Sequence, residues 1–117
     1  MKKDNQILTK SQDFAVRVVN LYKFLYNEKK EHVISKQLLR SGTSIGANVR
    51  EAHSGMSSAD FRAKMYIALK EASESEYWLE LLVKTDFITK KEFDSIYADC
   101  NELNKLLITI IKSINKN

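Results

Sequence analysis

A chain of 117 residues can bury one hydrophobic core, while the absence of proline and the presence of only three glycines argue against a turn-rich all-β fold. The longest unbroken apolar run, Met65 to Leu69, is far shorter than the ~20 residues of a membrane-spanning helix, and no signal peptide follows the lysine-rich N-terminus. The single cysteine, Cys100, excludes an internal disulfide and is typical of a reducing compartment, so we expect a cytoplasmic protein without a membrane partner.

Basic residues are concentrated in the first third of the chain. Residues 1–40 carry nine basic and four acidic side chains, residues 41–117 carry ten basic and eleven acidic ones, and the net charge is +4. A basic region of this size can bind an anionic partner such as RNA, and the alternative is an ordinary solubilising surface. The candidate nucleic-acid-binding residues are Lys10, Arg17, Lys23, Lys29, Lys30, Lys36 and Arg40, with Lys2 and Lys3 at the N-terminus.

The first predicted helix covers about residues 10–28. Thr9 and Gln12 have the spacing of a capping box, which favours a helix start at Thr9. Phe14, Val18 and Leu25 belong to one apolar stripe, and a second stripe lies directly beside it. The third predicted helix, at about residues 58–84, also has a second face that is partly apolar. Both helices therefore have more apolar surface than one bundle covers, which favours self-association.

The second predicted helix covers about residues 35–54. Gly42 and Gly46 lower its helix propensity by roughly 1 kcal/mol each, and close packing of the backbone against a neighbour is the compensation that we expect. Gly55 suits the left-handed residue that follows a helix end, and Ser57 or Ser58 can cap the next helix. Leu38, Gly42, Ile45, Val49 and Ala52 share the apolar face.

A polar stripe runs beside this apolar face. Asn48 and Glu51 need hydrogen-bond partners if they are buried, and we expect them to bond across to Ser73 or Glu76 of the third helix. The predicted polar seam consists of Ser44, Asn48, Glu51, Ser73 and Glu76.

The third and fourth predicted helices cover about residues 58–84 and 90–115. Both show heptad spacing of apolar or small residues, and Thr89 with Glu92 forms a capping box at the start of the fourth. Four amphipathic helices with short connections predict an all-α fold, an antiparallel up-down-up-down four-helix bundle that forms one domain over residues 1–117. The two seams are Phe61, Met65, Ala68, Ala72, Ser75, Leu79 and Leu82, and Phe93, Ile96, Cys100, Leu103, Leu107, Ile110 and Ile114.

No pattern in the sequence favours catalysis. His32 and His53 have no second ligand at metal-binding spacing, and Cys100 lies on an apolar seam without a histidine partner. The glutamates of the third helix lack the Glu-x-x-His repeat of di-iron bundles, so we interpret them as surface charge and helix-contact hydrogen bonds. We therefore expect a protein that is not an enzyme, with no cofactor, no metal and no small-molecule substrate.

The segment from Ser41 to Leu82 resembles the four-helix-bundle family of 23S ribosomal RNA intervening-sequence proteins. That family is in turn similar to the accessory protein of diversity-generating retroelements, a pentameric barrel of bundles whose basic surface contacts nucleic acid. The resemblance implies a homo-oligomer, with a pentamer as the expected assembly, RNA as a partner and no catalysis. It rests on Leu38 to Ala52, Ser58 to Phe61, Ala68 to Ser73 and Glu76 to Leu82.

Two functions follow from these observations. The first is an RNA-binding or RNA-associated protein that uses the basic residues given above. The second is a protein–protein assembly scaffold with no nucleic-acid role. The feature that distinguishes them is whether the basic side chains form one continuous strip on the surface of the assembled oligomer.

Overall fold

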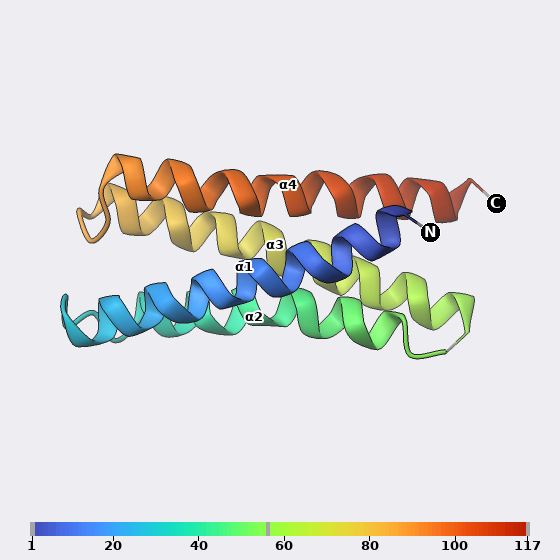
Figure 1. Cartoon of the computed structure of the whole chain (residues 1–117), viewed down its shortest axis with the longest axis horizontal. Helices are drawn as coiled ribbons and strands as arrows, with labels where there is room; N and C mark the ends of the chain where they lie inside the picture. The colour runs from blue at the N-terminus through green and yellow to red at the C-terminus, as the bar shows by residue number, and fades with distance from the viewer. Residues whose placement is uncertain (1, 56, 117) are drawn as a thin grey trace.

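The computed structural model describes residues 2–55 and 57–116, and in this part of the chain all regular structure is helical. Successive helices run in opposite directions side by side, so that both chain ends lie at the same end of the molecule (Figure 1). The predicted fold, an antiparallel four-helix bundle, is confirmed. The helices are α1 (Lys2–Asn27), α2 (Ile34–Ala52), α3 (Ser58–Lys84) and α4 (Lys90–Asn115).

The start of α1 differs from the prediction. The helix begins at Lys2, so Thr9 and Gln12 lie inside it and cap nothing. The physical reason is packing: Ile7 is fully buried and Ser11 is buried beside it, which continues the apolar stripe of Phe14 and Val18 toward the N-terminus. Tertiary burial outweighs the local capping signal here. The side chains of Lys2 and Lys3 lie outside the described part of the structure.

The four helices occupy the corners of the bundle. The helix α1 packs against α2 and α4, and α3 packs against the same two, so α1 and α3 are diagonally opposite. The predicted seams of α3 and α4 are confirmed, because all of their central positions are buried. The core contains one continuous cluster with Phe14, Leu38, Leu79 and Leu103 among its fully buried side chains.

The glycine and capping residues predicted from the sequence lie at a helix contact and at helix ends. A Cβ atom at Gly42 would lie 2.8 Å from Cγ2 of Val18, so the close approach expected for this glycine is between α2 and α1. Gly55 adopts a φ of 89°, as predicted for a residue that ends a helix. The hydroxyl of Ser57 accepts a hydrogen bond from the N–H of Asp60 (3.2 Å), and the Thr89–Glu92 capping box is confirmed.

The predicted hydrogen bonds of the polar seam are wrong. Asn48 donates its side-chain amide to the backbone oxygen of Ser44 (2.8 Å) within its own helix, and Ser44 in turn donates to the backbone oxygen of Arg40 (2.6 Å). Glu51 forms an ion pair with Lys64 of α3 (2.8 Å) on an exposed surface.

The buried polar contact between α2 and α3 is made by Ser41 and Ser75 instead. Their hydroxyl oxygens are 2.8 Å apart, and Ser75 also donates to the backbone oxygen of Glu71 (2.9 Å). Ser73 is exposed, and Glu76 accepts hydrogen bonds from Asn101 and Asn104 of α4 (3.2 and 3.0 Å). The predicted seam failed because Glu76 lies on the α4 side of α3 rather than facing α2.

Candidate nucleic-acid interface

Two of the predicted basic residues are engaged in ion pairs between helices. The ammonium nitrogen of Lys10 lies 2.9 Å from Oε2 of Glu102, and Nη1 of Arg17 lies 2.7 Å from Oδ2 of Asp99. Arg17 also donates to the backbone oxygen and to the hydroxyl of Ser95 (3.2 and 2.9 Å). These contacts tie the middle of α1 to α4, so the predicted basic residues do not form one continuous strip along α1.

The other predicted lysines collect at one end of the molecule. The α1–α2 loop and the α3–α4 loop lie together at the end opposite to the chain termini (Figure 1). The lysines of α1, the first loop and α2 are therefore joined there by lysines of α3 and α4, and all of these side chains are exposed. We call this set the cationic end: Lys23, Lys29, Lys30, Lys36, Lys84, Lys90 and Lys91.

Arg40 does not belong to the cationic end. It lies farther along α2, where its charge acts on Glu71 of α3. Within the cationic end, Lys90 is paired with Asp94 (2.8 Å), whereas no other lysine of the set makes an ion pair with the described residues.

Two carboxylates of the cationic end are engaged in helix capping. Glu31 is buried, and its two oxygens accept hydrogen bonds from the N–H groups of Val33, Ile34 and Ser35 (3.1, 3.0 and 2.7 Å) at the start of α2. Burial raises the pKa of Glu31, but the hydrogen bonds to its carboxylate together lower the pKa by more than burial raises it. The net pKa therefore lies below that of free glutamate. Lys30, with a positive φ of 56°, precedes Glu31 in the loop.

Glu92 takes part in the capping box of α4, in which the hydroxyl of Thr89 accepts from the N–H of Glu92 (3.1 Å). Its Oε1 accepts from the N–H of Thr89 (2.8 Å), and this hydrogen bond is the main reason that the pKa of Glu92 is lowered. The positive charge of Lys29, in the first loop, lowers the pKa of Glu92 further. Both carboxylates are therefore ionised and oriented toward helix N-termini at neutral pH.

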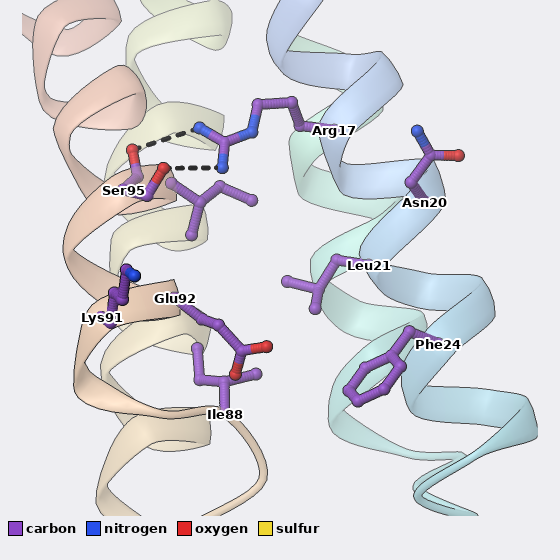
Figure 2. A pocket seen from close by; sticks show the side chains of 9 residues that line it. Arg17, Asn20, Leu21, Phe24, Ile88, Lys91, Glu92 and Ser95 are labelled. Atoms are coloured by element: carbon purple, nitrogen blue, oxygen red, sulfur yellow. Dashed lines mark hydrogen bonds between the residues drawn. The ribbon is translucent and has the colours of Figure 1, made fainter.

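A groove lies between α1 and α4 next to the cationic end (Figure 2). Its volume is about 490 Å³. In Figure 2 the side chains of Leu21 and Phe24 on α1 point toward the α4 side, where Ile88 and the carboxylate of Glu92 lie, and Arg17 bridges the two helices to Ser95. The lining residues are Arg17, Asn20, Leu21, Phe24, Ile88, Lys91, Glu92, Ser95 and Ile96.

The histidines and the cysteine lie apart from one another. His32 packs its ring against Tyr26, and His53 packs against Phe61 with its Nδ1 2.8 Å from the backbone oxygen of Val49. Cys100 is buried, and burial raises the pKa of its thiol. In residues 2–55 and 57–116 no group of three or more histidine, cysteine or acidic side chains is arranged to hold a metal ion.

Several structural contacts were not predicted. Glu31 lies in a charged stretch that only indicated a helix end, and its role depends on the turn at Lys30. Tyr97 donates to Glu80 (3.0 Å), and burial together with that hydrogen bond raises the pKa of Tyr97 to about 12. The one signal in the sequence for the Glu31 cap is its position three residues before the first apolar residue of α2, Ile34.

The fold and these surfaces define the class of protein: an all-helical bundle with a cationic end and an adjacent groove. None of the helices in the described part of the chain is long and apolar enough to cross a membrane. The chain belongs to the family of 23S rRNA-intervening sequence proteins, which it matches over residues 3–109. The resemblance seen in the sequence is thereby confirmed.

The same family relationship is found among solved structures. The chain is similar to a crystal structure from Bacteroides thetaiotaomicron that is described as a protein of unknown function from the S23 ribosomal protein family. The two share 64% sequence identity with a TM-score of 0.92, over 94% of this chain and 98% of that chain. Among curated proteins no match is found.

Proposed function

We propose that this protein is a non-enzymatic, cytoplasmic homo-oligomer that binds RNA through its cationic end. The observation that carries the proposal is the convergence of exposed lysines from both halves of the chain at one end of the bundle. The same segments also carry carboxylates: Glu31 and Glu92 accept hydrogen bonds at helix starts, and Asp94 pairs with Lys90, whereas Glu28 and Asp86 are exposed. Phosphate groups are the partner that such a lysine cluster fits best.

Exposed apolar side chains support self-association. On the outward surface of α1, Val16 is 56% exposed beside a hollow of about 310 Å³, and on α3, Tyr77 is 56% exposed. The indole N–H of Trp78 on α3 is buried without a hydrogen-bond partner in the described part of the chain. Because α1 and α3 are diagonally opposite, contact between these two surfaces of different copies is heterologous and closes into a ring when the rotation permits.

Ring formation would strengthen RNA binding without any new contact. One cationic end is a weak ligand for RNA, whereas several copies on one assembly let a single RNA make repeated phosphate contacts. The family resemblance implies five copies. The alternative is an assembly scaffold that binds only protein, which the exposed Val16 and Tyr77 favour as much as they favour self-association.

The proposal is tested by titrating the protein with a structured RNA at about 50 mM and about 200 mM salt. We expect binding at low salt that weakens steeply at high salt. Replacement of Lys29, Lys30 and Lys36 by Gln should weaken binding at low salt and flatten the salt dependence, by about one unit of log–log slope for each phosphate that the variant no longer neutralises. The assembly state should remain that of the parent, because the proposed self-association uses Val16 and Tyr77 rather than these lysines.

A matched control variant removes the same charge elsewhere on the bundle. Lys105 lies in the second half of α4, Lys112 in its last turn and Lys116 directly after it; all three are exposed and lie outside the cationic end. Their replacement by Gln should leave both affinity and salt slope close to those of the parent. Equal losses in the two triple variants would refute binding at the cationic end, and no binding by an intact oligomer would leave the scaffold function in its place.

A further inference from the structure

The groove between α1 and α4 has an apolar floor. Ile88 and Ile96 are each 4% exposed, Leu21 packs against the core, and Phe24 is 37% exposed at the side of the groove. Figure 2 shows Leu21 and Phe24 directed from α1 toward the α4 side. A flat apolar body can therefore lie between the two helices in contact with an aromatic ring.

Polar groups surround this floor. Asn20 and Ser95 contribute an amide and a hydroxyl, and Glu92 contributes its second carboxylate oxygen, because only Oε1 is used in the capping box. Arg17 closes one end of the groove by its two hydrogen bonds to Ser95 (Figure 2). Such donors and acceptors beside an apolar floor are the arrangement of a ligand site rather than of a plain helix contact.

Cations lie at the mouth of the groove. Lys91 lines it, and the ammonium nitrogen of Lys29 lies 5.7 Å from the centre of the Phe24 ring. Arg17 is paired with Asp99, and Glu92 places one ionised carboxylate in the groove, so the uncompensated positive charge comes from Lys29 and Lys91. A ligand that packs against Phe24 thus meets positive charge close to its aromatic body, which suits a group that joins a flat ring to a phosphate.

The size of the groove selects among possible occupants. A volume of about 490 Å³ lies in the range of small-ligand sites. An α-helix of a protein partner is about 10 Å across with its side chains, so it would place only a few side chains there. A single unstacked nucleobase is flat, has hydrogen-bonding edges and carries its phosphates on one side.

We propose that this groove receives one unpaired base of the bound RNA, which packs against Phe24 while its flanking phosphates contact Lys29 and Lys91. This inference rests on the proposed RNA-binding function and adds to it a preference for RNA with loops, bulges or single strands. Stacking on an aromatic side chain tolerates every base, so a strong sequence preference is not required.

The first test compares two aromatic side chains of α1 that are equally exposed. Phe24 lines the groove, whereas Tyr26 is 38% exposed, packs against His32 and does not line it. We expect Phe24→Ala to weaken binding of a single-stranded RNA by about five-fold or more, the lower end of what one base–aromatic stack contributes. Tyr26→Ala should bind like the parent.

The salt dependence separates this effect from charge. Phe24→Ala removes no charge, so its loss of affinity should be the same at low and at moderate salt, in contrast to the lysine variants. Binding of a fully paired RNA duplex should be unaffected by Phe24→Ala. If Phe24→Ala binds single-stranded RNA as the parent does while the lysine variants lose binding, the groove is refuted and the cationic end stands.

Photo-crosslinking locates the base without any substitution. The parent protein is irradiated with a single-stranded RNA that contains 4-thiouridine, and the crosslinked peptides are identified by mass spectrometry. We expect crosslinks within residues 17–24 and 88–96, which line the groove. Crosslinks confined to other surfaces would refute the inference, and the absence of any RNA binding would refute the proposed function along with it.

Discussion

Glu31 organises the start of α2 from a single buried position. Its carboxylate accepts three backbone hydrogen bonds, and Ser35 donates its hydroxyl to the backbone oxygen of Glu31 (2.8 Å). We expect Glu31→Ala to lower the free energy of unfolding by about 1–3 kcal/mol, because buried N–H groups then lack an acceptor. Denaturant unfolding at about pH 7 measures this change.

The control for this prediction is Glu31→Gln, which keeps one acceptor oxygen and should lose less stability. Because the pKa of Glu31 is lowered by folding, its stabilisation is fully present above the pKa of free glutamate, about 4.3. It is lost as the pH falls through the folded-state value. Equal stability of the parent and Glu31→Ala at neutral pH would contradict the capping role.

Folding shifts the pKa of Glu71 in the opposite direction to that of Glu31. Burial raises the pKa of Glu71, and the hydrogen bond and the negative charge of Glu74 raise it further. Its ionisation therefore opposes folding, and the protonated form is favoured in the folded state. We expect Glu71→Gln to be more stable than the parent at about pH 7.

The raised pKa of Glu71 also predicts how the stability difference between Glu71→Gln and the parent depends on pH. Below about pH 3 the glutamate is protonated in the folded and unfolded states, so the advantage of Glu71→Gln should disappear. Thermal unfolding of the two proteins at both pH values measures it. A variant that is less stable than the parent at neutral pH would show that the charge of Glu71 stabilises the fold.

At the scale of the helix, Gly42 sets the distance between α1 and α2. An added Cβ would lie 2.8 and 2.9 Å from the two methyl carbons of Val18, which is fully buried. We expect Gly42→Ala to destabilise by about 1–3 kcal/mol, because overpacking outweighs the gain of roughly 1 kcal/mol in helix propensity. Denaturant unfolding measures the change.

Gly46 provides the matched control on the same helix. A Cβ there would meet atoms no closer than 3.4 Å, those of Ser11. Gly46→Ala should therefore be neutral or stabilising by up to about 1 kcal/mol. A second substitution, Val18→Ala, should be less harmful in Gly42→Ala than in the parent. Additive effects of the two substitutions would contradict a direct clash.

Hydrophobic periodicity was sufficient to predict the helices and their buried faces. The seams of α3 and α4 repeat over several turns, and the caps of Thr89 and Ser57 depend on neighbouring residues only. The start of α1 was not predictable in this way, because burial of Ile7 depends on contact with distant residues. The hydrogen-bond partners of the polar seam were predicted wrongly for the same reason. The spacing of Asn48 shows on which face of the helix it lies, but not which residue it contacts.

The candidate site was predicted in part. Lysines on both sides of the first loop were identified from charge alone, whereas the ion pairs of Lys10 and Arg17 require that α1 lie beside α4. The lysines that α3 and α4 add to the cationic end, and the groove at Phe24, depend on the meeting of the two loops. Such juxtapositions follow from the tertiary fold and have no signature in the local sequence.

At the scale of the whole molecule, native mass spectrometry tests self-assembly and RNA binding together. Spectra of the parent protein are recorded with and without total cellular RNA. We expect a homo-oligomer in both spectra and additional species with the mass of bound RNA in the second. An oligomer that gains no RNA would leave the scaffold function, and a monomer without RNA would refute both self-assembly and RNA binding.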